Sequence, residues 1–70
     1  MTDVIINRTK KSIHIINDHL NRNYTLTNDN VDVSGKWYIF YIILDGEDGK
    51  IILPAERTNV IIIGSYENKK

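Results

Sequence analysis

A chain of 70 residues and 8.1 kDa has room for one domain, and a domain of this size buries only about 60 % of its unfolded surface. The absence of cysteine excludes disulfides, thiolate zinc sites and cysteine nucleophiles, and it suits a reducing compartment. Nine Lys and Arg residues balance nine Asp and Glu residues, so the chain lacks the net positive charge typical of nucleic-acid-binding domains.

The chain also lacks targeting and membrane-spanning signals. Its first residues contain no signal-peptide core, and its longest apolar run is far below the roughly 20 residues that cross a bilayer. We therefore expect a single small cytoplasmic domain over residues 1–70. Isoleucine and asparagine dominate, whereas alanine occurs once and glutamine is absent. Because β-branched residues favour strands and the best helix formers are scarce, the composition favours β-structure.

The N-terminal third predicts one strand and an ambiguous segment. Val4 to Asn7 is typical of a short strand, followed by a polar turn. In residues 9–22, Ile13 and Ile15 alternate with polar residues as in a strand, whereas Ile13, Ile16 and Leu20 have helical spacing. Because the many Asn and Asp residues that follow prefer turns, we favour a strand followed by a loop. A helix over about 9–22 is the alternative.

The middle of the chain predicts a hairpin and then a central strand. Tyr24 to Val33 contains two alternating segments around the turn-forming Asn28-Asp29-Asn30, as in a hairpin. The next eight residues from Trp37 onwards are all apolar. Alternation places one set on one face (Trp37, Ile39, Tyr41, Ile43) and a second set on the other (Tyr38, Phe40, Ile42, Leu44). Such a strand is expected to be central or to present an aromatic face to a partner.

The C-terminal third predicts two more strands. The acidic segment 45–50 is expected to reverse the chain, with Gly49 at positive φ. The returning strand, Ile51 to Leu53, is ended or placed at a sheet edge by Pro54. Val60 to Ile63 is the last strand, and a frayed tail is expected at about 66–70.

These elements predict a mainly β fold, a small antiparallel barrel or roll of five to six strands. The alternative is an α+β fold with one helix at about 9–22 packed on a four-stranded antiparallel sheet. A barrel would also protect the apolar edge of the last strand.

Residues suited to catalysis or metal binding are few. His14, Asp18 and His19 form the only such cluster, and even on a helix they would leave a metal one ligand short. The acidic residues 45–49 fit a solvated hairpin turn better than a calcium loop, because the strand-like residues 51–54 interrupt it. The sequence has no glycine-rich phosphate loop and no nucleophile motif. We therefore predict no enzymatic activity, no cofactor and no metal site.

The candidate binding residues are aromatic and basic. Exposed aromatic side chains can anchor a protein interface, or they can stack on unpaired bases while lysine and arginine contact phosphates. The predicted partner-binding residues are Trp37, Tyr41, Lys36, Arg8, Lys10 and Lys11.

The leading hypothesis is a small non-enzymatic protein-binding module, an inhibitor or modulator of a larger protein. The Ile- and Asn-rich composition suggests a phage or mobile-element accessory protein. The first alternative is a single-stranded nucleic-acid-binding small β-barrel. The second is a structural subunit of a homo-oligomer, with the edge Val60 to Ile63 buried between copies. A protein partner or self-association is thus expected first and nucleic acid second, and no membrane or small-molecule substrate is indicated.

Overall fold

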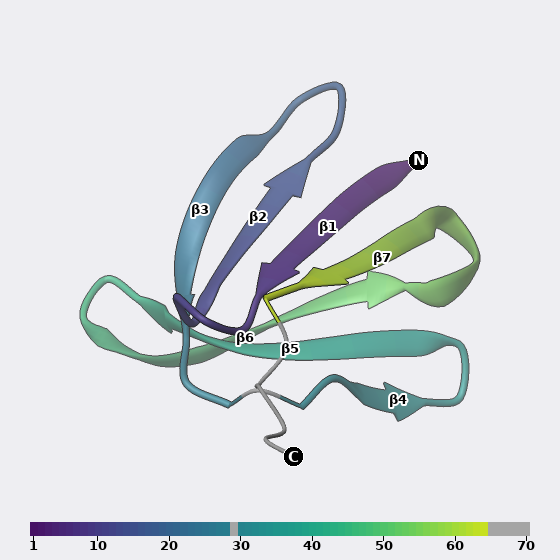
Figure 1. Cartoon of the computed structure of the whole chain (residues 1–70). Coiled ribbons are helices and arrows are strands. Elements are labelled where there is room, and N and C mark those ends of the chain that lie inside the picture. Colours follow the sequence, from purple (N-terminus) through teal and green to yellow (C-terminus); the bar gives the residue numbers. More distant parts are fainter. Residues whose placement is uncertain (29, 65–70) are drawn as a thin grey trace, which may run out of the picture.

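The computed structural model describes residues 1–28 and 30–64, and it consists almost entirely of strands (Figure 1). The elements are β1 Thr2–Asn7, β2 Ser12–Ile16, β3 Asn21–Leu26, β4 Asp32–Ser34, β5 Trp37–Leu44, β6 Glu47–Pro54, the 3-10 helix η1 Ala55–Arg57 and β7 Thr58–Ile63. The mainly β prediction is therefore confirmed, and the predicted central strand is β5, with the predicted bounds.

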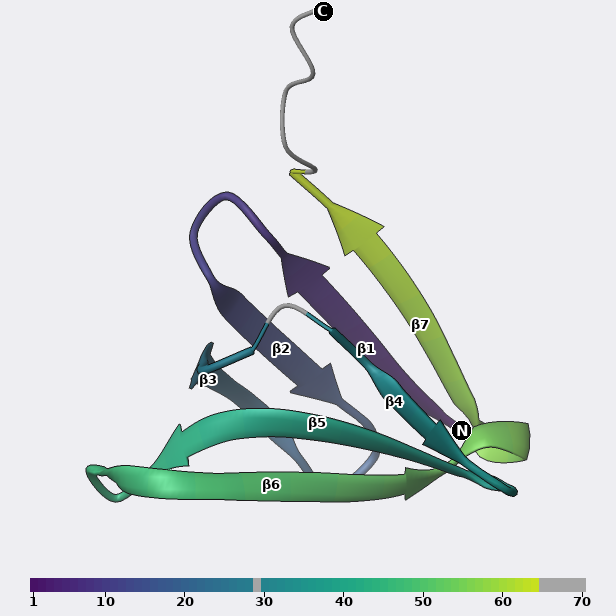
Figure 2. The same ribbon diagram turned by 90° about the horizontal axis from the view of Figure 1, so that it is seen from below.

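The strands form one curled sheet in the order β7-β1-β2-β3-β5. β6 pairs with one side of β5 over its whole length, whereas β3 and β4 share the other side. Figure 2 shows β5 and β6 as one layer that β1, β2 and β7 cross at an angle, so the sheet is a half-barrel. β1 and β7 are parallel, and all other pairs are antiparallel. The described residues thus contain seven strands in mixed orientation, rather than five or six antiparallel strands.

The core lies inside this curl, where alternate residues of four strands point inward. The buried residues are Val4, Ile6, Ile13, Ile15, Leu26, Phe40 and Ile42. Phe40 lies in the middle of β5, and its ring packs at a tilt against Tyr38, with centroids 6.1 Å apart. Full burial of side chains of this size contributes about 1.5–3 kcal/mol each. The even-numbered face of β5 is therefore the core face, and its odd-numbered face points outward.

The ambiguous segment is a strand followed by a loop, as favoured from the sequence. β2 ends at Ile16, and the loop closes where the Asn17 amide donates to the Leu20 carbonyl oxygen at 2.7 Å. The Asn17 side-chain oxygen accepts from the His19 amide at 2.8 Å. The described residues contain no α-helix, so the helical alternative over 9–22 is wrong. Asparagine caps this loop through local hydrogen bonds that a helix interior would not use.

The hairpin predicted over residues 24–33 does not form. β3 and β4 do not pair with each other, because each pairs with a different half of β5. Leu26 lies opposite Ile42, whereas Asp32 lies opposite Ile39. A local alternating pattern predicts strands, but it does not show which neighbour they choose, and the long β5 offers more backbone partners than three-residue β4 does. Asp29, at the centre of the expected turn, lies outside the described residues.

The β5–β6 reversal is tighter than predicted. Asp45 and Gly46 are its only two loop residues, with φ of 54° and 81°, and Leu44 lies opposite Glu47. Two left-handed residues are typical of a type I′ hairpin turn, whose twist matches that of the strands. Gly49 was expected in the turn at positive φ, but it lies inside β6 opposite Ile42. β6 ends at Pro54 as predicted, and the tail expected at 66–70 lies outside the described residues.

Candidate functional site

An apolar area covers the outer face of β4, β5 and β6. The strand register places Trp37 opposite Pro54, and Ile39 opposite Ile52, while Ser34 lies beside Trp37 on β4. Directly opposed residues share a face, so these five side chains lie together on the outside of the half-barrel. Trp37 is 49 % exposed and Ile52 is 51 % exposed. We call these five residues the Trp37 surface.

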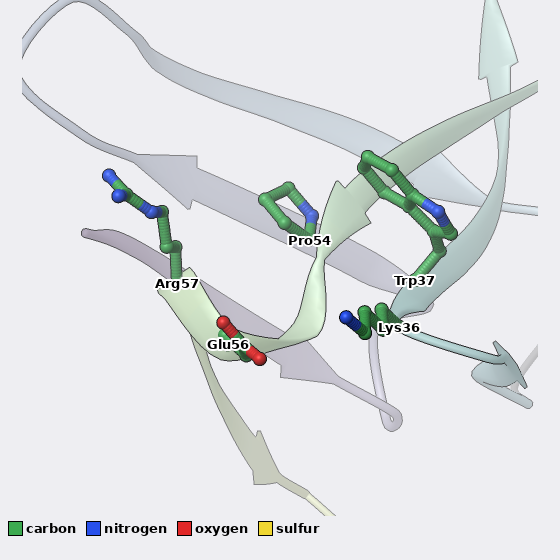
Figure 3. Close-up of a pocket in the computed structure, with 5 residues that line it drawn as sticks. All are labelled: Lys36, Trp37, Pro54, Glu56 and Arg57. Atoms are coloured by element: carbon green, nitrogen blue, oxygen red, sulfur yellow. The ribbon is translucent and has the colours of Figure 1, made fainter.

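Trp37 stands between two hollows of different character. The larger hollow, about 330 Å³, is lined by Ser34, Trp37, Ile39 and Ile52. The smaller, about 140 Å³, is lined by Lys36, Trp37, Pro54, Glu56 and Arg57. Figure 3 shows the smaller hollow, where Trp37 and Pro54 come from neighbouring strands and the charged residues come from the turn before β5 and from η1. The indole therefore has an apolar hollow on one side and a charged one on the other.

Tyr41 lies on the same outer face, four residues further along β5. Its hydroxyl donates to the Asp32 carboxylate at 2.6 Å. This hydrogen bond is the largest cause that raises the pKa of Tyr41, followed by partial burial and by the charge of Asp32. Because Asp32 belongs to β4, the contact ties that short strand to β5 through side chains as well as through the backbone. Tyr41 therefore lies on the outer face, and its hydroxyl already has a hydrogen-bond partner within the chain.

The predicted basic residues are not all near Trp37. Lys36 directly precedes Trp37 and lines the charged hollow. The β1–β2 turn, which carries Arg8, Lys10 and Lys11, lies at the other end of β5. There the Leu26 amide donates to the Lys11 carbonyl oxygen at 2.8 Å, and Leu26 pairs with Ile42. Ile42 is five residues from Trp37, or about 17 Å along the strand.

The side chain of Arg8 is only partly available to a partner. Its Nε atom is buried, and no hydrogen-bond partner for it is found within the described ranges. Its backbone amide donates to the Ile63 carbonyl oxygen at 3.0 Å, which joins the β1–β2 turn to the end of β7. Arg8 therefore takes part in the fold, whereas Lys10 and Lys11 are exposed.

The sequence interpretation missed Ile52 and Pro54 as members of the surface. Ile52 was assigned to a strand and Pro54 to its end, but neither was assigned to a face shared with Trp37. Had the two-residue turn at Asp45-Gly46 been recognised, the hairpin register would have followed, because loop length determines which residues oppose each other. The sequence therefore contains enough information to predict that Ile39 lies opposite Ile52.

The imidazole and carboxylate residues do not form a site. His14 lies on the outer face of β2, where a ring nitrogen contacts the side-chain oxygen of Asn21. Asp18 and His19 lie in the following loop, so the helical spacing of His14 and Asp18 has no structural counterpart. No group of three His, Cys, Asp or Glu residues suited to metal binding occurs in the part of the chain that the structure describes.

Comparisons with known proteins identify no relative. No protein-family model matches the chain, and neither the curated proteins nor the solved structures yield a match. Within residues 1–28 and 30–64, no helix has the length and apolar character that a membrane span requires.

Proposed function

We propose that this chain is a small non-enzymatic protein-binding module, and that the Trp37 surface is its principal contact area. The observation that carries the proposal is a half-exposed tryptophan flanked by an apolar hollow and a charged one. A chain of 70 residues with a small core gains stability by burying an indole. The half-exposed indole gives up part of that stability in the free protein, which supports a role for Trp37 in binding a partner.

The composition of this area resembles the centre of protein interfaces. Tryptophan and arginine are enriched among the residues that contribute most binding energy, and such anchors are surrounded by a polar rim. Here Trp37 would be the anchor, the Ile39–Ile52 pair would receive an apolar side chain, and Arg57 with Lys36 would form part of the rim. A role as inhibitor or modulator of a larger protein in the cytoplasm fits a neutral, cysteine-free chain of this size.

The geometry gives less support to single-stranded nucleic acid. A stacking platform needs several exposed aromatic rings beside cations. Tyr38 and Phe40 face the core, and the basic β1–β2 turn is about 17 Å along β5 from Trp37. The phage or mobile-element origin that we include in this proposal is supported by the amino-acid composition alone.

The proposal is tested by immobilising the wild-type protein, Trp37→Ala and Leu44→Ala and comparing the proteins that each retains from a lysate of the source organism. Leu44 is a matched control, since it is 44 % exposed on the same strand and lies outside the Trp37 surface. Any partner so found is then titrated in purified form. We expect Trp37→Ala to weaken binding by roughly 30-fold, as for a typical interface anchor, and Leu44→Ala to bind like wild type.

Fluorescence provides an independent readout, because Trp37 is the only tryptophan. Its emission should shift to shorter wavelength when the purified partner buries the indole. Equal retention by all three proteins, or an unchanged emission on binding, would show that the partner uses another surface. Binding of a mixed single-stranded oligonucleotide that weakens steeply with salt would favour the nucleic-acid alternative instead.

A further inference from the structure

β7 has a backbone edge without a partner among the described residues. One side of β7 pairs in parallel with β1, in a register that places Ile61 opposite Ile5. The Ile63 carbonyl oxygen accepts from the Arg8 amide, so Ile63 directs its backbone groups toward β1. The backbone groups of a strand alternate sides from one residue to the next. Ile61, two residues before Ile63, therefore also directs its backbone groups toward β1, whereas Val60 and Ile62 direct their N–H and C=O groups away from the sheet.

The side chains along this edge are uncharged, and the last four are aliphatic. β7 reads Thr-Asn-Val-Ile-Ile-Ile, and its last three residues are 41 %, 44 % and 46 % exposed. Such an edge is a template for pairing with another strand, and natural proteins usually protect it with charges, proline or a bulge. Within β7 itself none of these is present. A second strand along β7 would satisfy the backbone groups of Val60 and Ile62 and would cover the isoleucines.

The β7 strand of a second copy fits this edge better than the β6 strand of a second copy does. Without charges, β7 can lie antiparallel to itself with no like-charge repulsion between opposed residues. The outer strand β6, by contrast, carries Asp48, Lys50 and Pro54, so a head-to-tail contact of β6 with β7 would bury charges and lack one donor. A contact of β7 with β7 buries no charge, and it closes as a two-fold dimer instead of growing into a filament.

We propose that two copies of this chain pair antiparallel along β7, with Ile61 on the two-fold axis. Centring on Ile61 makes Val60 of each copy exchange hydrogen bonds with Ile62 of the other, as the outward backbone groups require. Ile61 then lies directly opposite its own copy in a non-hydrogen-bonded pair, with Cβ atoms about 4.5–5.5 Å apart. In the same register Thr58 lies opposite Gly64 of the partner copy. The Thr58 amide already donates to the Ala55 carbonyl oxygen, and the Gly64 carbonyl oxygen accepts from Thr9 Oγ1, so the two Val60–Ile62 pairs provide the backbone hydrogen bonds of the dimer.

This register makes a specific charge test possible. At a position on the axis, each residue meets itself, so Ile61→Lys places two ammonium groups side by side and Ile61→Glu places two carboxylates side by side. Each substitution alone should raise the dimer dissociation constant at least about tenfold. An equimolar mixture should instead form a heterodimer with an affinity near that of wild type, because the opposed charges then attract.

The measurement is sedimentation over a wide range of protein concentration, with circular dichroism to confirm that every variant is folded. Val33→Lys is the matched control: it puts the same charge on an exposed aliphatic residue of β4, outside both β7 and the Trp37 surface, and should dimerise like wild type. A failure of the Trp37 surface to bind a partner would leave this result unchanged, so the two proposals are tested separately.

Hydrogen exchange of the wild-type protein tests the same register without substitution. The Val60 and Ile62 amides should become more protected as concentration rises, whereas the Ile61 amide, bonded to β1, should be protected throughout. Three results would overturn the proposal: a wild-type monomer at all concentrations, full dimerisation of the single Ile61 variants, or no heterodimer in the mixture. Exchange of Val60 and Ile62 that does not depend on concentration would overturn it as well.

Discussion

The edge strands β6 and β7 differ in how they protect the backbone groups that point away from the sheet. Each pairs on one side only among the described residues. Along β6, the Lys36 carbonyl oxygen accepts from the Ala55 amide at 2.8 Å. The even-numbered residues of β5 therefore direct their backbone N–H and C=O groups toward β6. In the β5–β6 register their partners on β6 have odd numbers, which leaves Asp48, Lys50, Ile52 and Pro54 with backbone groups pointing away. Along β7, the outward-pointing residues are Val60 and Ile62.

The difference lies in what occupies the outward positions. On β6 they include two charged residues and a proline. The missing N–H of proline breaks no hydrogen bond there, because that position points away from β5. On β7 they are aliphatic. An edge with charge and proline resists pairing, whereas an aliphatic edge favours it. The same sheet therefore has one edge suited to remaining single and one suited to a partner, which is the basis of the proposed dimer.

The strongest test of this backbone assignment is a pair of proline substitutions in β7. Ile61→Pro removes an amide that faces β1, so it should destabilise the protein by about 2–3 kcal/mol. Ile62→Pro removes an amide that faces outward and should cost about 1 kcal/mol or less in the monomer. Denaturant unfolding at low protein concentration measures both. Equal losses would show that the outward and inward residues have been assigned incorrectly.

A pair of glycines tests how the two edge strands are attached. Gly64 follows β7 at φ of 68°, and an added Cβ would lie 2.7 Å from Thr9 Oγ1 and 2.8 Å from Asn7 Oδ1. Thr9 Oγ1 donates to the Gly64 carbonyl oxygen, so moving it breaks a hydrogen bond. Gly46, just before β6, has φ of 81° but open space around it. Both replacements thus strain the backbone, and only one creates a clash.

We therefore expect Gly64→Ala to destabilise the protein by about 2 kcal/mol and Gly46→Ala by about 1 kcal/mol. Thermal unfolding of the two variants against wild type measures the difference. If Gly46→Ala were the more damaging, the connection between β7 and the β1–β2 turn would contribute less than the structure indicates.

The smallest expected effect concerns the side of the sheet next to β6, where Tyr41 lies opposite Lys50. The Asp32 hydrogen bond raises the pKa of Tyr41 above its ordinary value of 10.0. The linked stabilisation is complete below the unfolded-state pKa and is lost as pH rises through the raised folded-state value. Asp32→Asn should lower the pKa of Tyr41 toward its ordinary value, as measured by ultraviolet or NMR titration, and should leave dimerisation through β7 unchanged. An unaltered pKa would show that the hydrogen bond is absent in solution.

The sequence predicted the parts of this protein that depend on local pattern. Eight apolar residues in succession gave the bounds of β5, and Ile13 and Ile15 indicated the strand that became β2. Pro54 marked the end of β6, because proline cannot donate to a ladder. Trp37 was identified as a binding candidate because its aromatic character and position in an alternating strand are both visible in the sequence.

Partner choice between strands depended on the tertiary structure. The alternating segments around residues 28–30 suggested a hairpin, yet both strands pair with β5, since its length offers each a separate set of backbone groups. The parallel pairing of β1 with β7 joins the two ends of the described chain, and contacts so distant in sequence leave no local pattern. The outer face shared by Trp37 and Ile52 also depends on register, which a change of one loop residue would shift. Local sequence thus determined where strands form and which residues are apolar, whereas the curl of the sheet decided which residues are buried and which edge stays open.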